Sequence, residues 1–532
     1  MRLALLIVCA LILEVGWLAL WPLSVTLSHS ALFTASLVES HPLIQSVLQA
    51  TSHLAPGLAQ STLTDPLGAD AYVVPATLFA ALMLGLASVY GLALLLLNFL
   101  QGVGSVRAWL AVIIGGAVLF QATLLLLPGV FSQDVFSYIA YGRLAAIYDL
   151  NPYIWPPSVL RDPIVPWVAD VWRTYATPYA PLWVNLQWLL ARLTAALPIA
   201  DQALVYRGLG NVLLLTNLAL VWRLLGRLTP LSPTQRVTSL AALAWNPLLL
   251  FEVAANAHND ILMVTFCLVG LLLFRATSKG TLTCIALTLG TLVKYLSGLG
   301  LIWLALAAAA RLDSWPRRAR RVAVLMALSI AISLALAAPW LELPDSLDPL
   351  LNETAGVGYV NSLPDALIVL LADRTGAALE PARNLERVLA IVAFTVYLAW
   401  EARRVWAEPG RAAIARALAR SSLVYVLVAS TSVQTWYFCL PLSVALVLGW
   451  RRGIARISLA YSALALPVLY LSYYLRDSLP PAIFIAYACA PLAVLLPDVV
   501  RARTRHANAR LLPPREQQQP SPPTSLPMPT PR

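Results

Sequence analysis

The chain has 532 residues, of which 60% are hydrophobic and only 11% are charged, and its mean hydropathy is +0.76. Soluble globular proteins carry about 25% charged residues, so this composition excludes a soluble domain and indicates that most of the chain lies in lipid. The formal net charge of +11 does not indicate nucleic-acid binding, because the basic residues of a membrane-spanning chain have to be interpreted by their position.

The first apolar run covers residues 2–22 and is long enough to cross a bilayer. We predict that it is a retained transmembrane helix and not a signal peptide, because no clear small-residue cleavage site follows closely and more spans come later. Glu14 lies inside this run. Since a carboxylate that faces lipid is costly, we expect Glu14 to face other helices.

Further apolar runs follow along the whole chain, some of them short. They lie near residues 72–99, 108–128, 205–226, 237–254, 261–275, 281–296, 297–310, 322–341, 386–402, 421–434, 436–450, 454–475 and 480–498. The runs predict an all-α polytopic membrane protein with about 13–15 transmembrane helices. Segment 181–197 is short and carries Arg192, so it is either interfacial or part of a re-entrant pair.

The placement of arginine and lysine predicts the orientation of the spans, because cytoplasmic loops are enriched in both residues. Segments 23–70 and 342–364 contain neither. The strongly basic segments are 311–321, 401–406, 411–420, 451–456 and 501–510. If Arg2 is cytoplasmic, the basic segments all fall on the cytoplasmic side, and the segments without lysine or arginine fall on the other side.

This topology predicts one transmembrane domain, residues 1–510, with extracytoplasmic loops 23–70, 129–180 and 342–385. Residues 511–532 are rich in proline and glutamine and are predicted to form a disordered cytoplasmic tail. The protein is therefore expected in the cytoplasmic membrane of a cell as a multi-pass protein.

Polar and aromatic residues from four distant segments fall at the extracytoplasmic ends of the predicted spans. These residues are Asp134, His258, Asn259, Asp260, Lys294, Trp436 and Tyr437. Ionisable side chains at membrane depth are rare and are usually paired or functional. Their gathering at one surface predicts an active site that opens away from the cytoplasm.

Simpler interpretations of single residues remain open. Ser132 could cap a helix whose dipole Asp134 complements, and aromatic residues at span ends often form an interfacial belt. Lys294 is one of only two lysines in the chain, and its ammonium group could reach the membrane surface instead of a partner.

Tyrosines on stiff turns occupy the long loop 129–180. Tyr153 ends the turn Asn151-Pro-Tyr, and Tyr179 lies between prolines in TPYAPLW. Proline and the residue before it favour extended backbone, which holds such rings in place. The rings suit stacking against sugar faces, and they suit interfacial anchoring equally well.

An ordered set of motifs carries a family resemblance from about residue 108 to 450. The motifs are DVFSYIAYGRLAAIYDLNPY (134–153), PYAPLW (178–183), NP (246–247) followed by AANAHNDILMV (254–264), LVKY (292–295) and VQTWYFCLPL (433–442). They resemble those of the polyprenol-phosphate-mannose-dependent α-1,6-mannosyltransferases of bacterial lipoglycan assembly, in the glycosyltransferase C superfamily. The AHND corner and the DVFSY…NPY stretch are the most specific of these motifs.

The resemblance implies a membrane enzyme that moves mannose, with inversion, from polyprenyl-phosphate-mannose to a mannan, lipoglycan or other glycan acceptor on the extracytoplasmic side. It implies that the catalytic acid of the early loop is Asp134, which we assign as general base. Cations for the leaving phosphate are expected from Lys294, Arg143 and, less directly, Arg207. Candidate substrate-binding residues are Tyr138, Tyr153, Tyr179, His258, Asn259, Asp260, Trp436 and Tyr437.

One departure from the superfamily pattern bears on metal ions. Many members have two acids close together in the early loop, whereas this chain has Gln133 next to Asp134. No metal ligand is therefore assigned, and a divalent metal is possible but unsupported. The cysteines lie in apolar runs, without the spacing of a disulfide framework or a zinc site.

Three alternatives stay open at the level of sequence. The same chemistry could use another lipid-linked sugar or another acceptor. A lipid or polysaccharide transporter is less favoured, because the chain shows no convincing internal repeat and its polar groups gather toward one surface. A non-catalytic scaffold of a cell-envelope complex would tolerate the loss of Asp134.

Overall fold

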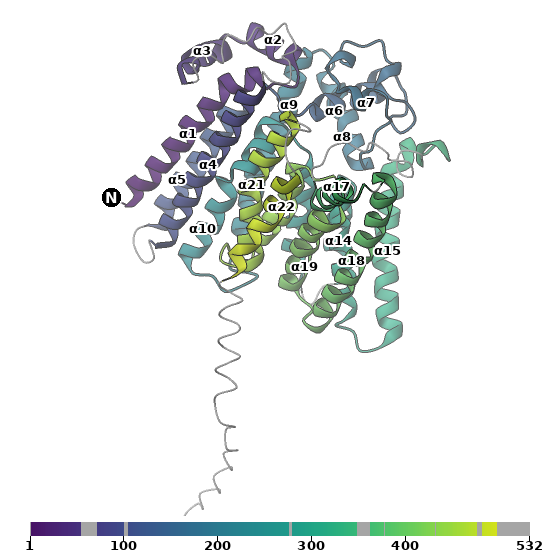
Figure 1. The fold of residues 1–532 in the computed structure, drawn as a ribbon. Helices are drawn as coiled ribbons and strands as arrows, with labels where there is room; N and C mark the ends of the chain where they lie inside the picture. The colour runs from purple at the N-terminus through teal and green to yellow at the C-terminus, as the bar shows by residue number, and fades with distance from the viewer. Residues whose placement is uncertain are drawn as a thin grey trace, which may run out of the picture.

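The computed structural model describes residues 2–54, 72–99, 105–275, 279–347, 362–376, 378–430, 432–475 and 481–496. Within these ranges the chain forms helices joined by turns and contains no strand, so the predicted all-α fold is confirmed (Figure 1). The predicted tail, 511–532, lies outside the described residues.

Eight stretches of helix in the described chain are long and apolar enough to cross a membrane. They are α1 (Arg2–Thr26), α4 (Val73–Phe99), α5 (Val106–Leu125), α9 (Ile199–Leu224), α10 (Pro233–Ala244) continued by α11 (Pro247–Leu249) and η5 (Leu250–Ala255), α15 (Trp315–Ala337), α19 (Arg411–Val424) continued by η9 (Tyr425–Ala429), and α21 (Gly453–Leu475). The chain is a polytopic membrane protein.

Several of the other apolar runs form helices that are shorter than a span. They are α12 (Asp260–Leu273), α13 (Thr281–Thr291), α14 (Leu299–Ala309), α20 (Cys439–Leu446) and α22 (Pro481–Cys489). At a rise of about 1.5 Å per residue, even α12 covers only about 21 Å of a hydrocarbon layer that is about 30 Å thick. The non-helical segments 256–259, 292–294 and 432–434 at their ends supply residues to the candidate site described below.

The remaining helices comprise one long helix and several short ones. They are α18 (Leu379–Ala407), which carries too many charges to count as a span by composition, and the short helices α2 (Ala31–Ser40), α3 (Pro42–Thr51), α6 (Asp134–Ile147), α7 (Asp170–Arg173), α8 (Pro181–Thr194) and α17 (Leu363–Thr375). In Figure 1, α2, α3, α6, α7 and α8 lie at the upper end of the molecule.

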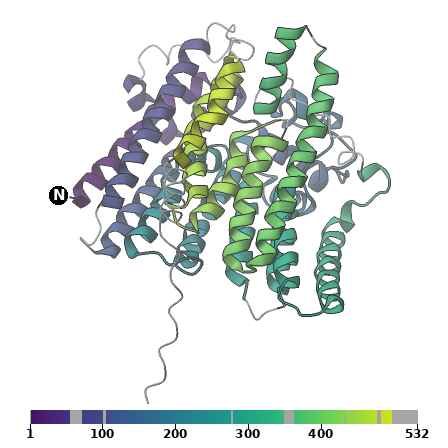
Figure 2. The ribbon, with the colours of Figure 1, turned by 60° about the horizontal axis from the view of Figure 1, so that its bottom comes forward.

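The long helices form two groups that lie side by side in both ribbon views (Figures 1 and 2). In the first group, α1 packs on α4 and α5, and α4 also packs on α21; in the second, α14 packs on α15, α18 and α19. Helix α20 packs on α21 of the first group and on α19 of the second, and α12 packs on α20, α9 and α19. Thr123 of α5 donates a hydrogen bond to Glu14 of α1, which confirms that Glu14 faces another helix.

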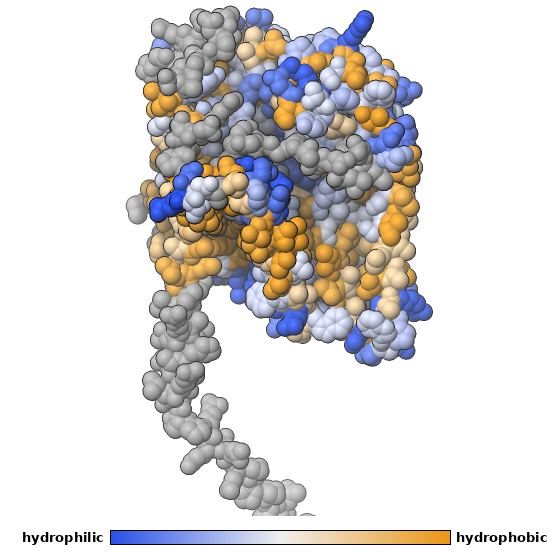
Figure 3. All heavy atoms as spheres, turned by 45° about the vertical axis from the view of Figure 1, so that its right-hand side comes forward, coloured by the Kyte–Doolittle hydropathy of each residue, from blue (hydrophilic) through white to orange (hydrophobic). Residues whose placement is uncertain are grey.

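The surface in Figure 3 shows hydrophobic side chains along the flank of the helices and hydrophilic ones toward the upper and lower ends of the molecule. Helix α15 is the most exposed of the spans, since only 6% of its most apolar window is buried, compared with 100% for the stretch 233–255. This contrast fits a rim helix that faces lipid and a central helix that supports the site.

Segment 181–197 forms helix α8, which packs closely on α6. A Cβ atom added to Gly142 of α6 would lie only 2.4 Å from the carbonyl oxygen of Gln187, so only glycine allows this approach. Helix α8 is not among the candidate spans of the described chain, and its packing fixes the helix that begins at Asp134.

Arg207 of α9 holds the connection between α5 and α6. Its guanidinium group is buried and donates hydrogen bonds to the carbonyl oxygens of Leu125, Leu127 and Gly129 at 3.2, 2.7 and 2.7 Å. It also lies 4.9 Å from the ring centroid of Phe33. Because the last carbonyl groups of a helix have no partner within the helix, Arg207 satisfies atoms that the fold would otherwise bury unpaired.

We expect Arg207→Met to lower the free energy of unfolding by about 3 kcal/mol or more, because three buried carbonyl oxygens lose a charged donor. Arg207→Lys should recover only part of this loss, since an ammonium group lacks the guanidinium fork. Thermal unfolding in detergent measures both. Arg192→Met, at an exposed position on α8, is the control, and equal melting temperatures for the variants at 192 and 207 would contradict the prediction.

Candidate active site

Asp134 is the first residue of helix α6, at the end of a buried connection from α5. The N-cap of α6 is Gln133, without a side-chain cap hydrogen bond, so Ser132 does not cap the helix; its Oγ atom accepts the backbone N–H of Asp134 at 3.3 Å. The side chain of Asp134 is 18% exposed, which leaves its carboxylate reachable from outside the protein. A helix start is also a favourable place for a negative charge.

The residues that face Asp134 come from an irregular stretch after α11. Helix η5 is a π-helix, a rare form that is frequent at functional sites, and Glu252 lies within it. Ala257 then adopts a φ of +61°, in the left-handed region that residues other than glycine rarely occupy. Such strain persists where the surrounding structure enforces it, and here it brings His258 back toward Glu252.

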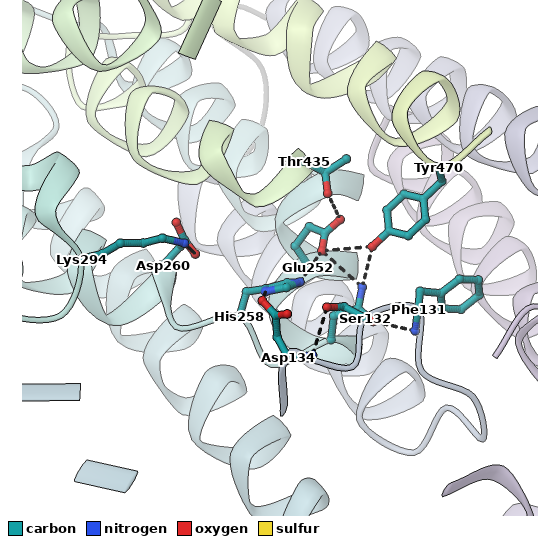
Figure 4. Close-up of polar contacts among 10 residues, drawn as sticks. Phe131, Ser132, Asp134, Glu252, His258, Asp260, Lys294, Thr435 and Tyr470 are labelled. Carbon is teal, nitrogen blue, oxygen red and sulfur yellow. Dashed lines mark hydrogen bonds and ion pairs between the residues drawn. The ribbon is translucent and has the colours of Figure 1, made fainter. Parts of the chain in front are cut away.

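His258 lies between two carboxylates (Figure 4). Its Nδ1 atom is 3.6 Å from Asp134 Oδ2, and its Nε2 atom is 3.1 Å from Glu252 Oε2. Both contacts are ion pairs by distance and neither has the alignment of a hydrogen bond. The imidazole ring also stacks on Trp436, with centroids 3.7 Å apart and planes inclined by 20°.

Glu252 is fully buried and is surrounded by hydrogen-bond donors. Thr435 donates to Oε1, and Asn256 Nδ2 donates to Oε2 at 3.2 Å. The hydroxyl of Tyr470 lies 3.5 Å from Oε2. The Oδ1 atom of Asn256 accepts the backbone N–H of Phe131 at 3.1 Å, so one amide ties the connection before Asp134 to the π-helix.

Lys294 pairs with Asp260 at one side of this group. The distance from Lys294 Nζ to Asp260 Oδ2 is 2.7 Å, and the ammonium group lies 5.0 Å from the ring centroid of Tyr437. Asp260 is 1% exposed whereas the Lys294 side chain is 24% exposed. The lysine therefore has a protein partner and still presents a cation at the surface of the site.

Burial raises the pKa of the Asp134 carboxyl above its ordinary value. The charges of His258 and Lys294 act in the opposite direction, and the negative charges of Asp260 and Glu252 raise the pKa further. A carboxylate with a raised pKa is a stronger base than an exposed one, which suits it to accept a proton.

An aromatic cluster adjoins Asp134 on the side of α6 and α8. The ring of Tyr138 lies 5.1 Å from that of Tyr179, 5.1 Å from Trp183 and 6.0 Å from Tyr206. Burial, and then the charge of Asp134, raise the pKa of the Tyr138 hydroxyl, so this group stays protonated. Asn259 is 2% exposed, and neither its amide nitrogen nor its amide oxygen has a hydrogen-bond partner among the residues that the structure describes.

The structure therefore places most of the candidate residues together. His258, Asp260, Lys294, Trp436 and Tyr437 join Asp134 through the contacts above, and Tyr138 and Tyr179 border them. Tyr153 is different, because its hydroxyl donates to the carbonyl oxygen of Tyr179 at 2.7 Å and fastens the loop to itself.

Both arginines that were predicted to bind phosphate contact other groups of the protein. Arg143 makes a bidentate contact with Asp162, with Nε and Nη2 within 3.1 Å of its carboxylate oxygens. This partner, together with hydrogen bonds from the Tyr148 hydroxyl and the Ile164 N–H, holds the pKa of Asp162 below its usual range although burial opposes it. Arg207 is bound to backbone carbonyls, as described above. Sequence spacing places Arg143 near Asp134, but it does not show that Asp162 and backbone carbonyl groups already hold the two arginines.

Glu252, Asn256, Thr435 and Tyr470 were not among the predicted site residues. Glu252 carries the clearest sequence signal, because it is an acid inside the apolar stretch 248–255 and next to the AHND corner. Tyr470 comes from a separate span and has no local signal. The described residues include no group of three or more histidine, cysteine or acidic side chains that could hold a metal ion. The prediction about a divalent metal stays a prediction.

Comparison with known proteins supports one family. A family model described as "Alpha-(1->6)-mannopyranosyltransferase, N-terminal domain" matches residues 42–310, which include Asp134, Glu252, His258 and Lys294. The chain is 28% identical over 363 residues to alpha-(1->6)-mannopyranosyltransferase A of Mycobacterium tuberculosis, which is 64% of this chain and 66% of the relative.

A probable alpha-(1->6)-mannopyranosyltransferase of Mycolicibacterium smegmatis is 28% identical over 156 residues, 29% of this chain and 27% of the relative. The chain thus spans slightly less than two thirds of the first relative and about a quarter of the second. No solved structure matches the chain significantly.

Proposed function

Because the chain belongs to the α-(1→6)-mannopyranosyltransferase family, we propose that it transfers a mannosyl residue from polyprenyl-phosphate-mannose to a mannan or lipoglycan acceptor. Membership confirms the resemblance seen in the sequence motifs. The transfer is proposed to form an α-1,6 linkage with inversion, on the extracytoplasmic side of the cytoplasmic membrane.

One observation carries this proposal: a mostly buried carboxylate of raised pKa and a reachable ammonium group belong to one site. The Asp134 carboxylate accepts the proton of the acceptor hydroxyl as its oxygen bonds to the anomeric carbon. The bond from that carbon to the phosphate oxygen breaks, and its electron pair leaves with the phosphate. Lys294 lies where a cation can stabilise this departing charge.

Other residues of the site suit a sugar. Trp436 and Tyr437 present aromatic rings beside His258 and Lys294. The unpartnered amide of Asn259 offers both a donor and an acceptor, which matches hydroxyl groups. The isoprenoid chain of the donor stays in the bilayer, so the protein needs to bind only the head group.

The distribution of charge supports the proposed side of the membrane. The arginine-rich segments 311–321 and 451–456 lie at the starts of α15 and α21. The far end of α15 contacts Asn151 in the loop after α6, and α21 brings Tyr470, near its other end, to Glu252. The positive-inside rule assigns the arginine-rich ends to the cytoplasm and the site to the other face.

The test is transfer by the purified protein. With a synthetic polyprenyl-phosphate-mannose and an oligomannoside, we expect a product one hexose heavier that an α-1,6-specific mannosidase shortens again. Below neutral pH the rate should fall at a higher pH than an ordinary aspartate would require, because the raised pKa keeps Asp134 protonated and a protonated carboxyl cannot act as a base.

Parallel reactions separate the alternatives. Transfer from GDP-mannose instead of the lipid donor would overturn the proposal, and transfer of glucose from its polyprenyl phosphate would correct the sugar. A cysteine at exposed Val159, labelled in intact cells by a membrane-impermeant maleimide, reports the side of the membrane. Protection of position 159 together with labelling at exposed Arg317 would invert the topology.

A further inference from the structure

The buried carboxylate of Glu252 has no part in the reaction as described so far, although one imidazole separates it from the proposed base. Both the Glu252 and the His258 side chains are fully buried. Burying charged groups without compensation costs several kcal/mol, so an arrangement of this kind calls for an explanation. The explanation that follows rests on the proposed function and concerns how Asp134 stays ionised.

With all three carboxyl groups of the site ionised, a protonated imidazole brings the charges closest to balance. Lys294 is paired with Asp260, which leaves Asp134 and Glu252 both facing His258. A neutral imidazole would leave two carboxylates uncompensated at either side of one buried ring. An imidazolium ion interacts favourably with both of them in a region of low dielectric.

The surroundings of Glu252 fit its ionised form. Thr435 and Asn256 each donate to a different carboxylate oxygen, and an ionised carboxylate accepts at both oxygens. The face of Trp436 lies against the imidazole ring, and an aromatic face attracts a cation. The hydrogen bonds thus favour an ionised Glu252, and the ring stacking favours a protonated His258.

We propose that Glu252 is a positioning residue: it keeps His258 protonated, and protonated His258 keeps the buried Asp134 ionised as the base for the acceptor hydroxyl. The acceptor proton goes to Asp134, and Glu252 touches neither substrate. Helix η5 and the turn at Ala257 place the three groups in line.

Removal of the Glu252 charge has two opposite effects on Asp134, and the sign of the result decides between them. Acting directly, Glu252 raises the pKa of Asp134. Its loss alone would therefore move the acid limb, the part of the pH–rate profile where the rate falls at low pH, to lower pH. Acting through His258, its loss removes a positive charge that lowers the pKa of Asp134, so the limb would move to higher pH. The proposal requires the second result.

Other titratable groups face Asp134 and remain in every variant tested here. They are Lys294 and Asp260 from the neighbouring corners, and Tyr138, Tyr141 and Tyr179 from α6 and the loop before α8. The tyrosine hydroxyls stay neutral, because burial raises the pKa of each of them. Their contribution is therefore constant across the pH range of the experiment.

The experiment measures kcat and KM for the lipid donor against pH in the wild type, Glu252→Gln, His258→Gln and the double variant. For both single variants we expect the acid limb to move up by about one pH unit, a tenfold loss of rate on that limb, with KM within about threefold. The double variant should match His258→Gln, because both substitutions remove the same effect.

An unmoved limb, a limb that moves to lower pH in Glu252→Gln, or independent and additive shifts would each overturn the proposal. Glu401→Gln is the matched control, since Glu401 is 2% exposed, pairs with Arg420 and lies in α18. It should lower stability without moving the limb. If Glu252→Gln does not fold, Thr435→Val removes one donor to the same carboxylate and should move the limb in the same direction by less.

The same data distinguish this inference from the proposed function. A wild type that shows no transfer from polyprenyl-phosphate-mannose would end the proposed function. A wild type that transfers mannose, with variants whose pH profiles do not move, would end only the role of Glu252.

Discussion

An Asp134→Asn protein is expected to fold and to bind the lipid donor, but to lose about 10³-fold in turnover, which is within the range that general bases contribute. Asparagine has the size of aspartate and can occupy the first turn of α6, yet it cannot accept the acceptor proton. The loss should therefore appear in kcat with little change in KM for the donor. Mass spectrometry of the product, followed over time, measures it.

Asp201→Asn is the control for this substitution. Asp201 is also an aspartate near the start of a helix, its side chain is 30% exposed, and it pairs with His41 at 3.4 Å. Exposed pairs of this kind contribute at most about 1 kcal/mol, so turnover should stay at the wild-type value. If a folded Asp134→Asn protein works within threefold of the wild type, about the scatter of such assays, Asp134 is not the base.

Loss of the Lys294 charge is expected to have the second-largest effect. Lys294→Met removes the cation that faces the departing phosphate, and we expect kcat to fall by about 10²-fold. The single variant also leaves Asp260 buried without its partner, which destabilises a protein by about 3–5 kcal/mol. Activity loss in that variant alone would therefore be ambiguous.

The double variant Asp260→Asn/Lys294→Met resolves the ambiguity. It contains no unpaired buried carboxylate at this pair, so stability should return while turnover stays low. Thermal unfolding and transfer assays on the same samples show both. Lys279→Met removes the only other lysine, at an exposed position, and should change neither. Near-normal turnover of the double variant would mean that Lys294 serves only to neutralise Asp260.

Much of the fold could be predicted because a bilayer imposes strong rules. Long apolar runs such as 72–99 and 454–475 correspond closely to α4 and α21. The short helices α12, α13 and α20 were less predictable in form, since hydropathy reports that a segment is apolar but not where its backbone leaves the helix. Their breaks create the site, and breaks depend on tertiary contacts.

In the candidate site, too, residues with a local sequence signal could be predicted, and contacts between distant segments could not. Asp134 and Lys294 could be singled out because each is an isolated charge among apolar residues. The role of Arg143 could not, because its carboxylate partner Asp162 is an ordinary loop residue in the sequence. The junction of Glu252 with Tyr470 joins spans far apart along the chain, and one sequence has no signal for such a contact.

The wide helical turn η5 also limits how the chain can change in length. A π-turn holds one residue more than the α-helix in which it sits. Deleting one residue between 250 and 255 would restore a regular helix and rotate the two flanking parts by about 100° relative to each other. The Glu252 carboxylate would then point away from the imidazole ring of His258. Insertions and deletions are thus more tolerable in exposed turns than in this helix, which is fixed residue by residue.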